Sequence, residues 1–224
     1  MAKFSLSCPA KSSHQAIHFA AGALKQPDWT FASSLKTIML TPDFFSQCAT
    51  SLRSLADDVQ KTTPPPKMEV TLAYSDFCES FPEAQTGELV RWAGKGTVIY
   101  RFAIRHGREQ SSVLERFNGC KTREKDLATQ AGIKPRAYCR ANQASSTLYV
   151  GSSRNLESRL RQHFGYKDRT TYSMQLTHWL QPGDIEQIHL SVWHCEGIHA
   201  VAVQAMEDHL WDVERPMLGK RGGR

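Results

Sequence analysis

Residues 147–164 read TLYVGSSRNLESRLRQHF, and this stretch predicts a strand, a turn and a helix in direct succession. Residues 147–150 are β-branched, apolar or aromatic, which are the residue types that pleated strands favour. A Gly-Ser-Ser turn follows, in which the hydroxyl of Ser152 or Ser153 is well placed to cap a helix over residues 155–164. The stretch therefore predicts a unit in which one strand leads directly into one helix.

The sequence on either side extends this unit. Short strands are expected at residues 136–140 and at residues 188–194, the second of which alternates in polarity. A second helix is expected over residues 199–213, and it ends before Pro216. The order β-β-α-β-α predicts an α+β fold, a small mixed β-sheet flanked by helices, in a domain of residues 132–224.

Residues 1–131 are predicted to form a mixed, partly helical amino-terminal region. Thr41 and Pro42 begin a helix whose apolar residues, from Phe45 to Val59, fall on one face. The other expected helices lie at residues 14–25, 86–92, 111–117 and 123–130, and the expected strands at residues 68–73 and 97–104. Residues 62–66, with three consecutive prolines, predict a stiff extended connector.

Charge is distributed unevenly along the 224 residues. The formal net charge is +6, but residues 101–169 alone carry 15 Lys or Arg against 6 Asp or Glu. The rest of the chain is therefore slightly acidic. Such a segment is the best candidate for a surface that faces phosphate groups, and it favours a polyanion as partner.

Composition excludes several other classes of protein. With 40% hydrophobic and 22% charged residues the chain is globular, and no apolar run approaches the length that spans a bilayer. The amino terminus lacks the apolar core of a signal peptide. The six cysteines are scattered without close pairs, as in reduced proteins. We therefore expect a cytoplasmic protein that has no membrane partner.

Several short motifs lie at compatible spacings between residues 132 and 220. Tyr149-Val150-Gly151 is followed by Arg159 on the expected helix, by His163 one turn later, and by Glu207 on the last helix. Together with Tyr138 these residues resemble the GIY-YIG nuclease family, which includes repair, homing and restriction nucleases. Two positions depart from the family pattern: the first triplet keeps only its tyrosine, Tyr138, and Gly219 stands where the family has an asparagine.

The resemblance implies a catalytic site that consists of Tyr138, Tyr149, Arg159, His163 and Glu207. Hydrolysis of a phosphodiester needs an activated water and stabilisation of extra negative charge. Glu207 could hold Mg²⁺ (or Mn²⁺), because such a hard cation binds through one carboxylate, waters and phosphate oxygens. Arg159 offers a fixed fork of donors to phosphate. Either tyrosine could orient or deprotonate the water, with Tyr138 preferred by family analogy, and His163 could shuttle a proton.

The implied function is that of an endonuclease that hydrolyses duplex or single-stranded DNA with the help of a metal ion. Such an enzyme would be site-specific, in the manner of a restriction enzyme, or specific for single strands. The amino-terminal region would then recognise DNA or pack on the nuclease domain. A homodimer is expected if both strands are cut. The expected DNA contacts are Arg105, Arg108, Lys121, Arg123, Lys125, Ser152, Arg154 and Arg161.

Other interpretations compete with this one. A DNA-binding protein that keeps the nuclease fold without catalysis would explain Gly219 and the incomplete first triplet. His194, Cys195 and His199 suggest a zinc site, but their spacing matches no standard one. Trp211 is interpreted as a core residue rather than as a platform for stacked bases.

Overall fold

The computed structural model describes residues 41–222. The helix expected at residues 14–25 lies outside this range. Residues Pro42–Arg224 form one compact unit. None of the helices within residues 41–222 is both long enough and apolar enough to cross a bilayer.

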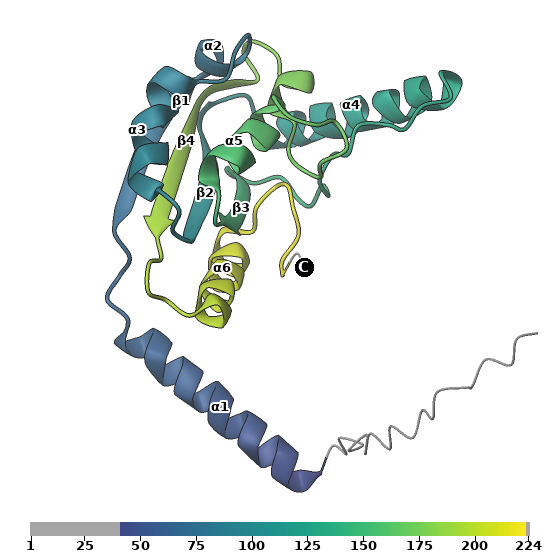
Figure 1. The fold of residues 1–224 in the computed structure, drawn as a ribbon. Helices are drawn as coiled ribbons and strands as arrows, with labels where there is room; N and C mark the ends of the chain where they lie inside the picture. Colours follow the sequence, from purple (N-terminus) through teal and green to yellow (C-terminus); the bar gives the residue numbers. More distant parts are fainter. Residues whose placement is uncertain (1–40, 223–224) are drawn as a thin grey trace, which may run out of the picture. The chain divides into compact units, whose positions relative to one another are not determined.

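A four-stranded sheet forms the centre of this unit, in the order β1-β4-β2-β3 (Figure 1). The strands are β1 (Lys67–Ala73), β2 (Val98–Gly107), β3 (Thr147–Ser153) and β4 (Ile185–His194). Every neighbouring pair is antiparallel. The α+β class is confirmed. The division at residues 131 and 132 needs correction, because β1 and β2 precede it and hydrogen-bond with strands that follow it.

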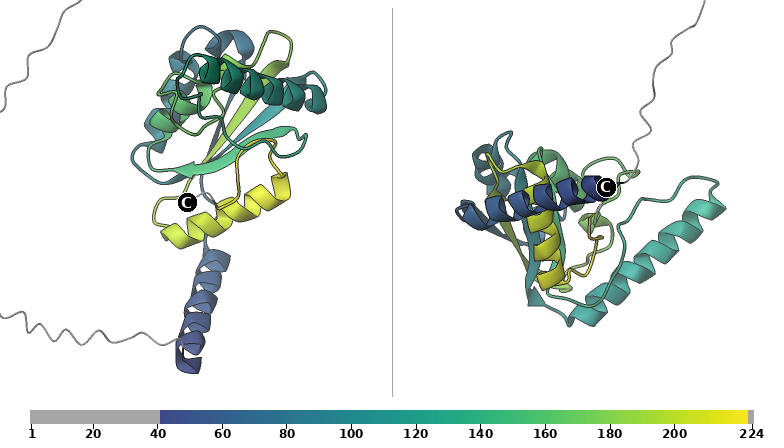
Figure 2. Two further views of the ribbon diagram at one scale, coloured as in Figure 1. Left: turned by 90° about the vertical axis from the view of Figure 1, so that its right-hand side faces the viewer. Right: turned by 90° about the horizontal axis from the view of Figure 1, so that it is seen from below.

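The described residues also form six α-helices: α1 (Pro42–Lys61), α2 (Tyr74–Phe77), α3 (Glu83–Ala93), α4 (Gln110–Gln130), α5 (Leu156–Phe164) and α6 (Ala200–Glu214). A short 3₁₀ turn, Leu176–His178, lies before β4. The helices expected at residues 111–117 and 123–130 are one continuous helix, α4. It extends away from the sheet in several views (Figures 1 and 2).

The strand expected at residues 136–140 is wrong. In this segment Tyr138 makes one isolated bridge with Ser173, and no described strand includes it. The position beside β3 is occupied by β2, whose Val98, Tyr100 and Phe102 are completely buried. A longer apolar strand buries more surface than a five-residue segment that contains two arginines, so β2 is the favoured partner.

The alternation of side chains along β2 assigns one helix to each face of the sheet. Tyr100 and Phe102 point to the face covered by α5, where their rings contact His163 and Phe164. Ile99 points to the opposite face and packs in a smaller apolar cluster with residues of α6. Because β3 is an edge strand, α5 and α6 approach each other around its outer side.

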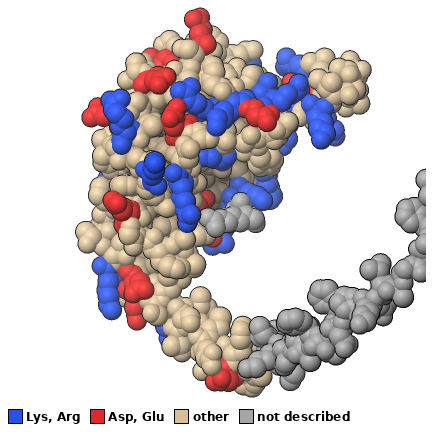
Figure 3. Space-filling model, in the orientation of Figure 1, with Lys and Arg blue, Asp and Glu red and all other residues tan. Residues whose placement is uncertain are grey.

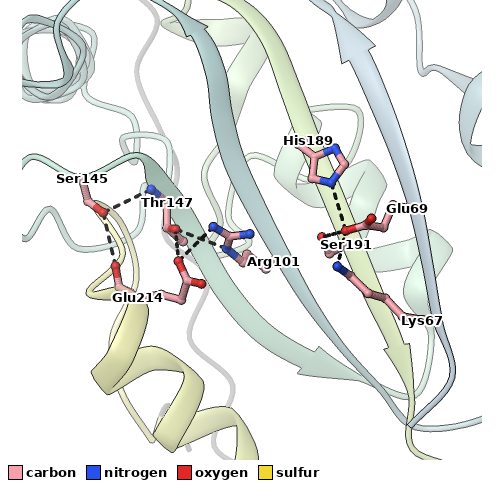
Figure 4. A network of polar contacts seen from close by, with 8 residues as sticks. All are labelled: Lys67, Glu69, Arg101, Ser145, Thr147, His189, Ser191 and Glu214. Carbon is pink, nitrogen blue, oxygen red and sulfur yellow. Dashed lines mark hydrogen bonds and ion pairs between the residues drawn. The ribbon is translucent and has the colours of Figure 1, made fainter. Parts of the chain in front are cut away.

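Two polar networks stabilise the unit, one between α6 and the sheet and one between β1 and β4 (Figure 4). In one, Arg101 pairs with Glu214 at 3.0 Å, and Thr147 donates a hydrogen bond to the same carboxylate. This network fixes the carboxyl end of α6 to β2 and β3. In the other, Glu69 of β1 accepts from Lys67, Ser191 and His189, and the hydrogen bond from Lys67, followed by that from Ser191, lowers the pKa of Glu69 to about 2.

Substitution of Arg101 by Met should lower the free energy of unfolding by about 1–2 kcal/mol, because it leaves Glu214 half-buried without its cation. The matched control is Arg221→Met. Arg221 pairs with Asp212, but both side chains are about half exposed, so the loss should stay below about 0.5 kcal/mol. Urea unfolding of both variants is the measurement. Equal losses would show that the Arg101 pair does not fix α6.

Candidate active site

A cleft of about 330 Å³ opens at the β3 edge of the sheet, between α5 and α6. Its lining residues come from both helices, from β2 and β3, from two loops and from the segment after α6: Tyr100, Cys139, Tyr149, Gly151, Ser152, Arg159, Tyr172, Gln204, Glu207, Gly219 and Lys220. The cleft therefore brings together Tyr149, Arg159 and Glu207 of the five expected catalytic residues. A second tyrosine, Tyr100, joins them.

Tyr100 lies at the centre of a hydrogen-bonded group on the floor of the cleft. Its hydroxyl oxygen is 3.1 Å from Nε2 of His163 and accepts a bond from Nε of Arg159 at 3.4 Å. The pKa of Tyr100 is raised by burial, and the guanidinium of Arg159 acts in the opposite direction. Tyr100 therefore carries its own proton at neutral pH and can donate it to a group in the cleft.

His163 supports Tyr100 from behind and does not line the cleft. It is completely buried, and its Nδ1 accepts a hydrogen bond from the backbone N–H of Met174 at 3.4 Å. Burial, reinforced by the charge of Arg159, lowers its pKa well below 6.5, so the ring is neutral with its proton on Nε2. His163 therefore donates to Tyr100 and orients it. It has no access to solvent for the shuttle role expected from the sequence.

Tyr149 stacks on Tyr100, with ring centroids 6.2 Å apart and planes 10° from parallel. Its hydroxyl accepts from Nη2 of Arg159 at 3.4 Å, and burial raises its pKa. Gly151 allows this arrangement, because a Cβ there would lie 2.7 Å from the Tyr149 ring and 2.8 Å from the Tyr100 hydroxyl. The glycine of the Tyr-Val-Gly triplet is thus required by the approach of two rings.

Glu207 faces the tyrosines from α6. It is the one carboxylate among the described residues that line the cleft, and Gln204 lies one turn before it. No group of three or more His, Cys, Asp or Glu side chains in the part of the chain that the structure describes is arranged to hold a metal. A single carboxylate with space for water and phosphate suits Mg²⁺, which keeps several waters in protein sites. The zinc site suggested by His194, Cys195 and His199 is not formed.

Tyr138, the tyrosine expected from the first triplet, lies outside the cleft. Its side chain is 4% exposed, packs edge-on against Phe117, and has its hydroxyl 3.7 Å from Sγ of Cys120. Tyr100, rather than Tyr138, lines the cleft beside Tyr149. The sequence did contain a signal for Tyr100, because Val98-Ile99-Tyr100 lies near the start of an expected strand. The insertion of α4 and the loop after it, however, separates Tyr100 from Tyr149 along the chain.

The residues expected to contact DNA fall into different environments. Ser152 lines the cleft, and Arg154 lines a small pocket beside it. Lys121 donates to the carbonyl of Cys139 at the cleft rim. Arg161 is engaged elsewhere, because it pairs with Glu157 and Glu83 and lies over the ring of Phe81. The remaining positions are exposed, at the end of β2 or on α4: Arg105, Arg108, Arg123 and Lys125.

Gly219 has a positive φ of 102°, and a Cβ there would lie 2.8 Å from the Tyr149 ring. The ring therefore occupies the space that the family asparagine would need. The amide of Asn142 donates to the carbonyls of Pro216 and Gly219 at 3.0 and 3.1 Å. The insertion thus supplies an asparagine that supports this turn from another direction.

Gly219→Ala should lower the free energy of unfolding by about 1–3 kcal/mol more than Gly132→Ala. Both glycines have positive φ, but a Cβ at Gly132 meets nothing within 4 Å. The difference between the variants in urea unfolding therefore isolates the contact with Tyr149. Equal losses would contradict the close approach of that ring.

The buried His163 predicts a defined pH dependence of stability. Its folded-state pKa is lowered, so the stability is complete above pH 6.5 and falls at lower pH, where only the unfolded chain takes up the proton. One such group contributes a slope of up to about 1.4 kcal/mol per pH unit. His163→Gln should remove this part of the slope between pH 5 and 6.5 in urea unfolding. Parallel curves for the two proteins would be the contradictory result.

Comparison with known families supports the same region. Residues 136–219 match the family model described as the GIY-YIG catalytic domain, a range that contains Tyr149, Arg159 and Glu207 but not Tyr100. Comparisons with curated proteins and with solved structures gave no match. The chain therefore contains a region, residues 136–219, that matches the GIY-YIG catalytic domain.

Proposed function

We propose that this protein is a metal-dependent endonuclease that hydrolyses phosphodiester bonds in DNA. The observation that carries the proposal is the convergence of Tyr100, Tyr149, Arg159 and Glu207 on one cleft of about 330 Å³. These side chains come from four different elements of the sheet unit. The cleft offers hydroxyl groups, a fixed cation and a carboxylate, which are the groups that phosphodiester hydrolysis requires.

Arg159 is the proposed electrostatic partner of the scissile phosphate. Its guanidinium is held by Tyr100, by Tyr149 and by Gln162, the last at 2.6 Å. A guanidinium fixed in this way loses little conformational entropy when phosphate oxygens bind, and it remains charged at any working pH. Arg159 therefore binds the phosphate and stabilises the negative charge that develops in the transition state.

Tyr100 is the proposed partner of the attacking water. Because His163 and Arg159 both donate to its oxygen, the hydroxyl proton is directed away from them and toward the cleft. As a neutral phenol it orients the water. Any lowering of its pKa by positive charge in the cleft would enable it to accept the water's proton.

Glu207 is the proposed ligand for Mg²⁺ (or Mn²⁺). When bound, the metal supplies Lewis-acid stabilisation of the phosphate and leaving oxygen. Glu207 holds the negative charge on α6 opposite Arg159, and the Arg101–Glu214 pair two turns later holds that helix against the sheet. The positive charge of Arg159 and the negative charge of Glu207 are therefore both held in position before the substrate binds.

The proposed substrate is DNA, and the insertion that contains α4 is the proposed element for recognition of a specific site. Lys and Arg side chains gather along α4 and near the carboxyl end of the described chain (Figure 3). Arg123 and Lys125 are exposed on α4, where they can contact the phosphate backbone. One such active site cuts one strand, so double-strand cleavage would require two copies or two successive cuts.

A non-catalytic DNA-binding protein is the alternative function. Its main support in the sequence was Gly219, but the packing of Tyr149 against this glycine explains why no larger residue stands there. Tyr100 likewise supplies the cleft with a second tyrosine hydroxyl, which Tyr138 of the incomplete triplet does not bring to it. These observations favour the enzyme over the alternative.

Tyr100→Phe should lower the cleavage rate about 10²- to 10⁴-fold, which is the usual contribution of a positioned acid–base group. Tyr138→Phe is the matched control and should cleave at nearly the wild-type rate, because its hydroxyl does not reach the cleft. Glu207→Gln should abolish cleavage but retain DNA binding. The measurement is Mg²⁺-dependent cleavage of plasmid, linear duplex and single-stranded circular DNA.

Several outcomes would contradict the proposal. No cleavage by the wild-type protein, together with measurable DNA binding, would favour the non-catalytic alternative. Loss of activity in Tyr138→Phe with full activity in Tyr100→Phe would restore the assignment made from the first triplet. Discrete fragments would support site specificity, whereas uniform degradation would exclude it.

A further inference from the structure

A second groove of about 620 Å³ lies next to the catalytic cleft. It is lined by the end of α6 and by the segment after Cys139: Arg140, Ala141, Asn142, Gln143, Trp211, Asp212, Arg215 and Pro216. Cys139 and Gly219 line the cleft itself, so the two hollows are adjacent along both of these segments. None of the roles proposed above uses the side chains of Arg140, Trp211 or Arg215.

One stripe of α6 passes along three hollows in succession. Gln204, Glu207 and Trp211 are spaced by three or four residues and therefore share one side of the helix, and Arg215 directly follows the last helical residue. A small pocket of about 60 Å³ is lined by Gln204 and Arg154, the cleft by Gln204 and Glu207, and the second groove by Trp211 and Arg215. The catalytic cleft is thus the middle of a longer track.

The arginines at the two ends of this track are available to bind an anion. Within residues 41–222, no carboxylate lies within ion-pair distance of Arg140, Arg154 or Arg215. The one acidic residue of the groove, Asp212, already pairs with Arg221 at 2.8 Å. Phosphate groups are the ligands that such unpaired guanidinium groups favour.

Trp211 adds an aromatic surface to the groove that Arg140 and Arg215 also line. The side chain is half-buried, and its indole Nε1 has no hydrogen-bond partner among the residues described. The earlier interpretation of Trp211 as a core residue is therefore incomplete. Aromatic rings beside cations are the recurrent platform for nucleic acid bases, which stack on the ring while the backbone contacts the charges.

We propose that one DNA strand lies along this track, from Arg154 across Glu207 to Trp211 and Arg215, so that the second groove binds the nucleotides on one side of the scissile phosphate. The proposal rests on the nuclease function above and extends it to substrate contacts. From Gln204 to its last residue, Glu214, the helix rises about 15 Å, enough for about four phosphates of one duplex strand. Arg154 and Arg215 are binding residues on opposite sides of the cut.

The test measures affinity of the full chain for a 30-nucleotide DNA, single-stranded and duplex, in EDTA between 50 and 200 mM salt. Arg154→Gln and Arg215→Gly should each lower the slope of log affinity against log salt by about one. Glycine is chosen at position 215 because Arg215 has φ 45°, which glycine adopts without strain. Arg215→Lys should keep the slope.

Trp211 is tested through stacking rather than charge. Trp211→Ala should weaken binding of the single strand about tenfold with no change of salt slope, and Trp211→Phe should stay within about threefold of the wild-type protein. Arg91→Gln is the matched control for lost charge, because Arg91 on α3 lines none of the three hollows. Urea unfolding verifies that each variant is folded.

The results separate this inference from the proposed function. The track alone would be overturned if the wild-type protein cleaves DNA but Arg154→Gln and Arg215→Gly both match Arg91→Gln in DNA affinity and in salt slope. DNA binding that shows the expected losses without any cleavage would overturn the nuclease function and leave the track as a binding surface. Absence of any DNA binding would overturn both.

Discussion

The antiparallel pairing of β2 with β3 is the constraint on which the site depends. It places Tyr100 opposite Gly151, and the missing side chain of that glycine allows Tyr100 and Tyr149 to stack. One guanidinium, that of Arg159, then reaches both hydroxyl groups. A register shift by one residue would turn Tyr100 to the other face of the sheet and disperse this group.

The two charged side chains that the proposed chemistry needs come from helices on opposite faces of the sheet and meet at its edge. Arg159 belongs to the helix on one face, and Glu207 to the helix on the other. Because β3 is the last strand, both helices reach past it into the same cleft. The ion pair between Arg101 and Glu214 holds α6 in place, so a contact on the sheet surface controls the position of the carboxylate.

Among the arginines of residues 41–222, two groups have different roles. Arg101, Arg161 and Arg221 are neutralised by carboxylates of the protein and contribute to its structure. The guanidinium groups beside the cleft and groove have no such partners in the described chain. Positive net charge in the sequence is therefore a weak guide to a binding surface, since only the tertiary structure distinguishes paired from unpaired arginines.

The sequence by itself determined the local elements: the strand at residues 147–150, the helix after it and the last helix, because periodicity and capping act between near neighbours. It also predicted that Tyr149, Arg159 and Glu207 belong to one site, and these three residues line the same cleft. Only the tertiary structure decided that Tyr100, not Tyr138, completes the cleft. Strand pairing joins residues far apart in the chain, and the choice depends on which segment buries more apolar surface beside β3, a comparison that no local pattern contains.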